Sequence, residues 1–244
     1  MSEQDTTTNA EKLRVVTIDG PSGVGKSTVS RRVASKLGFT YLDTGAMYRA
    51  VAYACKQAGI NPANPEQQEA LLILLKQLDL CLLPSDQKDD NVQVLLQDED
   101  ISTAIRSPEM SMAASKVSAV PAVRACLTTM QQEMGKAGGV VAEGRDTGTV
   151  VFPDATWKFY LDASPEERCR RRVDQLRNQG QEVDEQETLA QIIERDQNDK
   201  ERTIAPLVMA QDALLIDSSS LNADEVVARM LEVVSSGCIL GAMD

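Results

Sequence analysis

The chain has 244 residues, of which 42% are hydrophobic and 25% charged, and this length suits a single domain (residues 1–244) with its own core. Its formal net charge of −12 argues against a nucleic-acid partner, because duplex binding depends on Lys and Arg side chains that neutralise phosphates. No apolar run approaches the ~18 residues of a membrane span, and the polar first dozen residues have no hydrophobic signal core, so we expect no membrane partner.

Residues 14–27 join an apolar strand pattern to a phosphate-binding motif. Residues 14–19 predict a buried strand, and residues 20–27 match the pattern G-x-x-x-x-G-K-[ST] at every required position. A helical pattern follows over residues 27–37, so strand, loop and helix stand in the order that this motif needs, which a chance glycine-rich turn does not require. We therefore predict a site for a nucleoside triphosphate, formed by Gly20, Pro21, Ser22, Gly23, Val24, Gly25, Lys26, Ser27 and Thr28.

Each part of this motif has an expected task. The glycines let the loop curl, so that backbone N–H groups and the helix N-terminus face one phosphate. Lys26 is expected to reach the outer phosphates, and the Ser27 hydroxyl is the expected ligand of Mg²⁺.

Four more strand patterns follow, and helical patterns separate most of them. We expect strands at residues 39–43, 139–143, 156–162 and 213–217, and a second amphipathic helix at residues 46–58. This alternation predicts an α/β fold with a five-stranded parallel sheet flanked by helices. Acidic residues end the strands: Asp19, Asp43, Glu143, Asp162 and Asp217. Ligands of such sheets bind beyond the carboxyl ends, so at least the first three are expected to line a cleft.

Two regions depart from this alternation. Residues 60–105 contain a Leu-rich stretch and two strand patterns (79–83 and 91–97) around a polar loop at 84–90, which predicts a small antiparallel insertion. Residues 164–186 open with Ser-Pro-Glu-Glu, the pattern of a capping box with Pro at the first helical position, and Gly180 is expected to end that helix. We expect a helical lid here, with its arginines at positions Arg168, Arg170, Arg171, Arg172 and Arg177.

Arginines outside the phosphate loop narrow the class of protein. A kinase that joins two anionic substrates needs cations between their phosphates, and this chain offers Arg49, Arg124, Arg145, Arg195, Arg202 and the lid arginines. The alternative for the lid is a solvated helix face whose arginines pair with neighbouring carboxylates. Thr44 also has two interpretations, as the N-cap of the helix at 46–58 or as a group that faces a ligand.

Two absences bear on location and chemistry. The five cysteines are scattered and form no C-x-x-C pair, so we expect reduced thiols and a cytoplasmic protein. The chain contains no histidine, the commonest general base. A phosphate acceptor is already ionised near neutral pH and needs no such base, because its second pKa is ~6.

The motifs together resemble those of the bacterial cytidylate kinase family. The resemblance runs in order from about residue 13 to residue 234, and the block G-R-D-x-G-T-V-V-F-P-D-A is its most specific part. The insertion at 60–105 also resembles the enlarged monophosphate-binding region of this family. The matching segments are residues 16–27, 42–49 and 143–155, Glu194-Arg195-Asp196, Asp199, Arg202 and Ala205-Pro206-Leu207.

The resemblance implies a P-loop kinase core that transfers the γ-phosphoryl group of ATP to CMP or dCMP, giving ADP and CDP or dCDP. We expect the protein to be a monomer. Lys26, Mg²⁺ on Ser27 and the lid arginines, among which we choose Arg171, would stabilise the transferred group. The other implied contacts are the acceptor phosphate for Arg49 and Arg145, the cytosine base for Thr44, Arg124, Asp146 and Arg202, and the sugar for Ser115, Arg195 and Asp199. Asp146 can accept from the exocyclic amine of cytosine but not from the carbonyl of uracil. Some members have Ser at the position of Thr44.

Two other functions fit the residues less well. One is a small-molecule kinase on the same core that uses a different acceptor. The other is a regulatory P-loop module that uses nucleotide only as a switch, against which the acceptor-side arginines speak.

Overall fold

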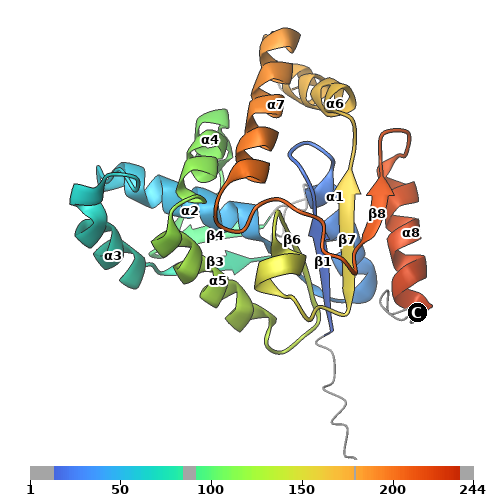
Figure 1. Ribbon diagram of the computed structural model, residues 1–244, viewed down its shortest axis with the longest axis horizontal. Helices are drawn as coiled ribbons and strands as arrows, with labels where there is room; N and C mark the ends of the chain where they lie inside the picture. Colours follow the sequence, from blue (N-terminus) through green and yellow to red (C-terminus); the bar gives the residue numbers. More distant parts are fainter. Residues whose placement is uncertain (1–13, 85–91, 179, 237–244) are drawn as a thin grey trace, which may run out of the picture.

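The computed structural model describes residues 14–84, 92–178 and 180–236 (Figure 1). A five-stranded parallel sheet lies at its centre in the order β2-β6-β1-β7-β8. These strands are β1 (Val15–Asp19), β2 (Thr40–Asp43), β6 (Val140–Gly144), β7 (Trp157–Asp162) and β8 (Leu214–Asp217). The predicted fold class and all five strand positions are confirmed. The N-terminal tail and residues 85–90 of the predicted polar loop lie outside the described residues.

The sheet has helices on both faces, and strand alternation decides which side chain faces which layer. On β1, Val15 joins the core beneath α2 (Thr44–Gln57), α4 (Pro108–Val117) and α5 (Pro121–Gly135). Val16 and Ile18 face the opposite core, beneath α1 (Lys26–Leu37) and α8 (Ala223–Ser235). The same alternation directs the side chains at the ends of β2 and β6 toward α1, the helix that follows the phosphate loop.

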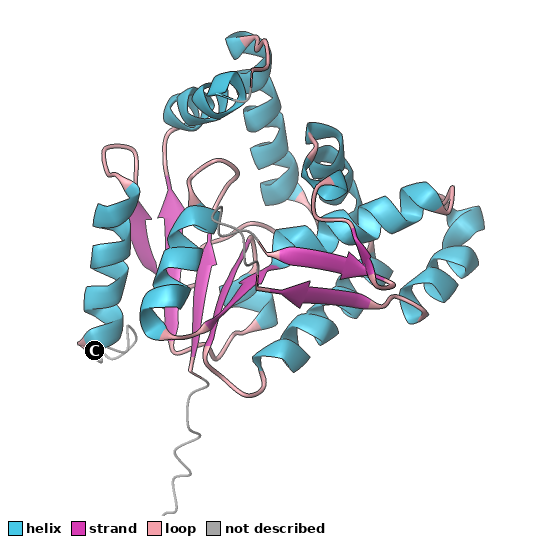
Figure 2. Cartoon of the chain, turned by 180° about the vertical axis from the view of Figure 1, so that it is seen from behind, coloured by secondary structure: helices cyan, strands magenta, loops and turns pink. Residues whose placement is uncertain are grey.

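The insertion is an antiparallel sheet with helical turns around it (Figure 2). It consists of η1 (Pro65–Gln67), α3 (Gln68–Lys76), β3 (Leu80–Leu83), β4 (Gln93–Leu96), β5 (Glu99–Asp100) and η2 (Ala104–Arg106). The two predicted strands pair in antiparallel register, which confirms the prediction. The third strand, β5, was missed, because two residues after a turn are too short for an alternating pattern.

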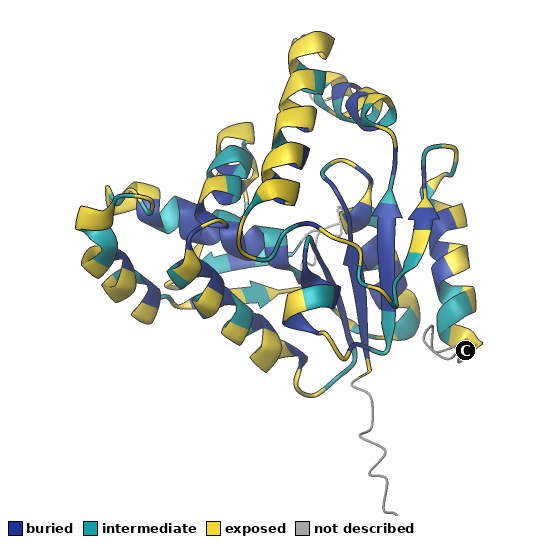
Figure 3. Cartoon of the chain, in the orientation of Figure 1, coloured by how far each residue is buried: buried dark blue, intermediate teal, exposed yellow. Residues whose placement is uncertain are grey.

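Two helices, α6 (Pro165–Asn178) and α7 (Glu185–Glu201), stand above the carboxyl ends of the strands (Figure 1). A small apolar cluster of Cys169, Val173 and Ile192 and the ion pair of Arg168 with Asp196 hold them together, and α7 is exposed along most of its length (Figure 3). The predicted boundary of the lid at residue 186 falls in the first turn of α7. The division into a core, an insertion at 60–105 and a lid at 164–186 stays a prediction.

Two predicted helix caps differ from the structure. Asp43, not Thr44, is the N-cap of α2, because its Oδ1 accepts a hydrogen bond from the backbone N–H of Ala46 at 2.8 Å. At α6 the capping box is only half formed. Ser164 Oγ accepts from the N–H of Glu167 at 3.2 Å, but the N–H of Ser164 donates to Ser219 Oγ instead of to the Glu167 carboxylate.

The observations on membrane spans and disulfides apply only to the described residues. There, no helix is both long and apolar enough to cross a membrane. The cysteines in these ranges, Cys55, Cys81, Cys126 and Cys169, are unpaired, and Cys238 lies outside them.

Gly135 allows α5 to lie directly against Phe152, the residue that follows the π-helical turn η3 (Thr147–Val151). A Cβ atom at position 135 would lie 2.3 Å from Cε1 of the Phe152 ring. Overpacking of a core costs about 1–3 kcal/mol, against a helix-propensity gain of about 1 kcal/mol. We therefore expect Gly135→Ala to lower the free energy of unfolding in urea by up to about 2 kcal/mol. Met134→Ala, at an exposed site of the same turn, is the control; equal stability of the two variants would contradict the steric argument.

Candidate active site

The predicted phosphate loop lies between β1 and α1, so strand, loop and helix occur in the expected order. A Cβ atom on Gly20 would lie 2.0 Å from the carbonyl oxygen of Leu161, which leaves room for glycine alone. Gly25 is the N-cap residue of α1 and has a φ of 93°, in the left-handed region that favours glycine. These two glycines bring the loop backbone over the start of α1, and Thr28 lies half-buried in the first turn of that helix.

Lys26 is held inside this loop. Its side chain is buried, and Nζ donates to the carbonyl oxygens of Gly20 at 2.7 Å and Pro21 at 2.5 Å. Burial lowers the pKa of Lys26, and the charges of Arg145 and Arg195 lower it further. An ammonium group in these surroundings gains from a nearby anion, because burial has removed part of its hydration.

Three arginines gather around Lys26, and we call these four residues the cationic cluster (Lys26, Arg49, Arg145 and Arg195). Burial, Arg145 and Arg49 lower the pKa of Arg195 to about 10. Among the described residues, the buried Nε atoms of Arg49 and Arg195 have no hydrogen-bond partner. Unpaired buried donors are costly, so the cationic cluster is suited to an anion that accepts from them.

Each arginine of the cationic cluster is oriented by a different element. Arg49 Nη2 contacts Asp43 at 3.1 Å, and Arg145 Nε contacts Asp199 of α7 at 2.8 Å. Arg195 Nη1 donates to Ser22 Oγ of the phosphate loop at 3.2 Å. Arg195 therefore lies at the phosphate loop, and the sugar contact implied for it stays a prediction.

A second polar group surrounds Asp146. This carboxylate is buried and forms ion pairs with Arg124, from α5, and with Arg202 at 3.3 Å, from the end of α7. Ser118 completes the group, because its carbonyl accepts from Arg124 and its hydroxyl from Arg202. The structure thus brings together three of the four residues implied for the base.

Two members of this region were not predicted. The ring of Tyr48 lies 5.5 Å from the guanidinium carbon of Arg124, and burial raises the pKa of Tyr48 to about 12. In the sequence, only the position of Tyr48 next to Arg49 indicated that it belongs to the site. Ser118 is the C-cap of α4, a helix that the sequence patterns did not identify, so nothing indicated it.

Thr44, Ser115 and Asp199 lie around these groups. Thr44 is buried and its hydroxyl donates to the carbonyl of Glu143 at 2.6 Å, which leaves its oxygen able to accept one further bond. Ser115 is half-buried on α4, and its carbonyl accepts from the Ser118 hydroxyl at 2.7 Å. Asp199 is paired with Arg145, which holds the pKa of Asp199 below its usual value although burial raises it. Asp199 thus joins α7 to the cationic cluster.

The lid arginines divide into two groups. Arg168 is buried, pairs with Asp196 at 2.6 Å and donates to the carbonyl of Ser22 at 3.0 Å. Arg171 donates to the carbonyl of Val24 at 3.3 Å and to Ser218. The remaining three pair with side chains of the lid itself: Arg170, Arg172 and Arg177. The solvated-face interpretation therefore fits Arg170 and Arg177, which are exposed and pair with carboxylates, whereas Arg172 is half-buried and bonds to Gln175. Among the lid arginines only Arg168 and Arg171 contact the phosphate loop, and Arg171 also pairs with Glu167 at 2.8 Å.

The carboxylates that end β1, β2 and β6 differ in what they bind. Both oxygens of Asp19 accept from residues 147 and 148, and Asp43 caps α2 and pairs with Arg49. Glu143 Oε1 accepts from the Tyr41 hydroxyl at 2.5 Å, whereas its Oε2 is buried without a partner among the described residues. Burial raises the pKa of Glu143, Asp43 raises it further, and Lys26, Tyr41 and the Ser27 hydroxyl act in the opposite direction.

A divalent cation fits beside Ser27 and Glu143 only when substrate phosphates supply further ligands. Among the residues that the structure describes, no group of three or more Cys, Asp or Glu side chains could hold a metal ion. Ser27 and the free Oε2 of Glu143 supply hard oxygen ligands, and Mg²⁺ typically keeps several waters and binds one or two protein groups plus phosphates. The residues present therefore fit a hydrated Mg²⁺ that arrives with a nucleotide.

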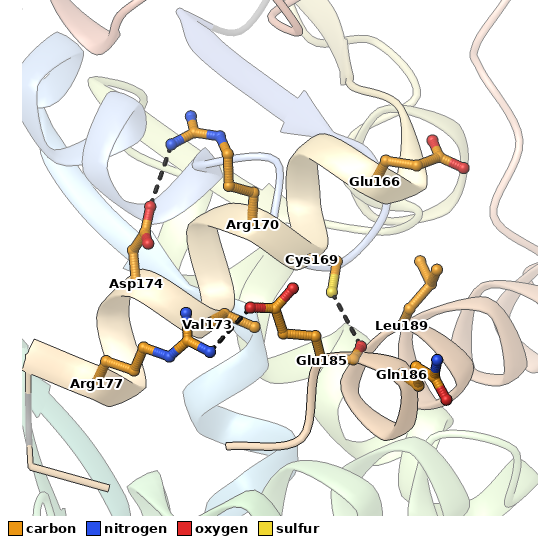
Figure 4. Close-up of a pocket in the computed structure, with 9 residues that line it drawn as sticks. All are labelled: Glu166, Cys169, Arg170, Val173, Asp174, Arg177, Glu185, Gln186 and Leu189. Atoms are coloured by element: carbon orange, nitrogen blue, oxygen red, sulfur yellow. Dashed lines mark hydrogen bonds and ion pairs between the residues drawn. The ribbon is translucent and has the colours of Figure 1, made fainter. Parts of the chain in front are cut away.

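A separate pocket of about 310 Å³ lies between α6 and α7 (Figure 4). Cys169, Val173 and Leu189 supply its apolar side, and Arg170 and Arg177 lie at its rim. No residue of the cationic cluster lines it, so the two sites are distinct.

Comparison with known proteins gives consistent matches. Residues 16–236 match the sequence profile of the family described as cytidylate kinase. The chain is 48% identical over 221 residues to a cytidylate kinase of Syntrophotalea carbinolica, covering 91% of this chain and 92% of that protein. It is 47% identical over 226 residues to one of Shewanella sp. strain MR-4, covering 93% and 96%. A shikimate kinase structure from Bacteroides thetaiotaomicron is 14% identical, with a TM-score of 0.46 and coverage of 91% and 99%, a likeness too distant to indicate function.

Proposed function

Since the chain belongs to the cytidylate kinase family and transfers a phosphoryl group from ATP to CMP, we propose how its own residues perform this reaction and that dCMP is a second acceptor. The observation that carries the proposal is the cationic cluster, with two unpaired buried Nε atoms in a chain of net charge −12. Two anionic nucleotides repel each other until such cations lie between them. The monomeric state and the cytoplasmic location remain predictions from the sequence.

The phosphate loop binds the donor. Backbone N–H groups of residues 20–27 and the N-terminus of α1 receive the phosphates of ATP. Lys26 exchanges its bonds to the carbonyls of Gly20 and Pro21 for contacts with the outer phosphates. The low pKa of Lys26 supports this role, because a desolvated ammonium gains most from a bound anion.

Arg49 and Arg145 hold the acceptor phosphate of CMP. Asp43 and Asp199 orient the two guanidinium groups, so the fork of donors is in place before substrate binds. The nucleophile is an oxygen of that phosphate, which is ionised near neutral pH, so no general base is required. Arg195 lies between the phosphate loop and Arg145, so we assign it contacts with the phosphates of both substrates.

The base and sugar of CMP lie toward Asp146. Its carboxylate is an acceptor matched to the exocyclic amine of cytosine, and Arg124 and Arg202 keep it in place. Thr44 contributes its hydroxyl to the base, and Ser115 and Asp199 lie on the sugar side. Residues 60–105 form the monophosphate-binding insertion in this scheme.

Mg²⁺ and the lid complete the donor site. Ser27 and, through a water molecule, Glu143 are the residues that would hold Mg²⁺. When bound, the ion would neutralise charge on the donor phosphates. Arg171, now bonded to the Val24 carbonyl, is the lid arginine that we assign to the transferred group, within a lid (164–186) that excludes water.

A panel of acceptors tests this function. With ATP and Mg²⁺ we expect rapid ADP formation with CMP and dCMP, slower formation with UMP, and background rates with AMP and shikimate. The reason is that only cytosine offers an amine donor to Asp146 in the required position. A coupled ADP assay gives the rates, and detection of the nucleoside diphosphate identifies the product. A preference for AMP or shikimate would contradict the proposal and favour another small-molecule kinase.

A further inference from the structure

We propose that Tyr41 is a positioning residue for phosphoryl transfer: its hydroxyl fixes the carboxylate of Glu143, so that Oε2 stays available beside Ser27. The inference deepens the proposed function and rests on it. The Tyr41 hydroxyl donates to Glu143 Oε1, so we expect the effect of this hydroxyl on the reaction to pass through Glu143.

The sheet places the two side chains within reach of each other. In the parallel pairing of β2 with β6, Tyr41 is opposite Val141 and Asp43 is opposite Glu143. Tyr41 and Glu143 are therefore diagonal neighbours on the face toward α1. The Tyr41 ring packs in the core beneath α1, and its hydroxyl donates to Glu143 Oε1 at 2.5 Å. Both ends of this contact are thus fixed by rigid elements.

Glu143 is the one carboxylate at the ends of β1, β2 and β6 that keeps a buried oxygen free. The oxygens of Asp19 receive three donors from residues 147 and 148, and those of Asp43 receive Ala46 and Arg49. The bond from Tyr41 satisfies only Oε1 of Glu143. Oε2 has no partner of hydrogen-bond geometry among the described residues, although the Ser27 hydroxyl lies close enough to lower the pKa of Glu143. Such a buried acceptor is open to a donor, for example a water molecule that arrives with a ligand.

The hydrogen bond from Tyr41 also keeps the Glu143 carboxylate from pairing with Lys26. A glutamate side chain has three rotatable bonds, and a carboxylate beside Lys26 is attracted to its ammonium group. In the structure Lys26 Nζ instead donates to the Gly20 and Pro21 carbonyls. By holding Glu143, Tyr41 keeps the lysine charge for phosphates and leaves Oε2 for a water of hydrated Mg²⁺.

Tyr41→Phe removes this hydroxyl and retains the ring. Loss of a group that orients a ligand lowers metal affinity by about 10- to 100-fold. We expect Mn²⁺ binding to the ATP-loaded protein, measured by electron paramagnetic resonance of free Mn²⁺, to weaken about 10-fold or more. ATP affinity without metal and the KM for CMP should be unchanged. Tyr53→Phe, a half-buried tyrosine on α2 in the opposite core, is the control and should change none of these values.

Glu143→Gln provides the second variant. If Tyr41 acts through Glu143, adding Tyr41→Phe to Glu143→Gln weakens Mn²⁺ binding little further, because neighbouring residues of one network are not additive. A full additional loss in the double variant would overturn the proposal. So would unchanged Mn²⁺ binding in Tyr41→Phe, even with a lower melting temperature, because only a structural role would then remain.

The same measurements separate this inference from the function on which it rests. Wild-type protein without CMP-dependent ADP formation would refute the proposed function and the inference with it. Wild-type turnover together with a Tyr41→Phe variant that binds Mn²⁺ normally would refute the role of Tyr41 alone.

Discussion

Lys26→Ala is expected to lower kcat by about 10²- to 10³-fold, the usual cost of removing one donor that stabilises charge in a transition state. Lys26 is the cation that the phosphate loop holds inside itself, at 2.7 Å from the Gly20 carbonyl. A coupled ADP assay with saturating ATP and CMP measures the change. Turnover near the wild-type value would contradict the assignment of the loop.

The fold should survive this change. Burial lowers the pKa of Lys26, so the charged lysine is less favourable in the folded chain than in the unfolded one at neutral pH. Removing it does not lower the free energy of unfolding through this linkage. Urea denaturation checks the point, and Lys36→Ala, exposed in the last turn of α1, is the matched control for both measurements.

Arg145→Ala is expected to weaken CMP binding much more than ATP binding. A hydrogen bond to a charged group contributes about 1.5–3 kcal/mol, so the Kd of CMP should rise roughly 10- to 100-fold. The Kd of ATP should change little, because the phosphate loop supplies most donor contacts. Isothermal titration calorimetry with each nucleotide separates the two. Equal losses would overturn this division of tasks.

The partner of Arg145 supplies the control for this second experiment. Arg145→Ala leaves the buried carboxylate of Asp199 without the guanidinium at 2.8 Å, so stability should fall as well. Asp199→Asn breaks the same ion pair but retains the guanidinium. It should therefore lose less CMP affinity than Arg145→Ala. A loss as large as that of Arg145→Ala would show that Asp199, by orienting Arg145 or by the sugar contact proposed for it, contributes as much to CMP binding as the charge of Arg145.

The fold was predictable where the signal is local. A strand such as β1 shows as a short apolar run with turn residues after it, and the phosphate loop requires a fixed spacing of glycines and lysine. The choice between neighbouring caps was not predictable, since Asp43 and Thr44 are both good N-cap residues. The pairing of Asp43 with Glu143 in the sheet sets where β2 ends, and α2 then begins at Thr44.

The site was predictable in its members and much less in their contacts. The family resemblance indicated Arg124, Asp146 and Arg202, but not that Asp146 pairs with both arginines, which come from distant parts of the sequence. The lid arginines are alike in sequence, and only the packing of α6 over the phosphate loop separates Arg168 and Arg171 from the others. Tyr41 gave no signal, because a tyrosine in a strand is ordinary core composition.

Because Asp146 forms ion pairs with both α5 and the end of α7, the carboxylate that we propose for base recognition also joins two elements of the fold. A substitution of Asp146 that adapts the site to another nucleobase also removes the ion pairs that join α5 to the end of α7. Directed evolution toward new acceptors should therefore progress more easily through Tyr48, which lies beside Arg124, than through Ser118, which bonds to both arginines. Asp146 itself should change only after compensating mutations have stabilised the scaffold.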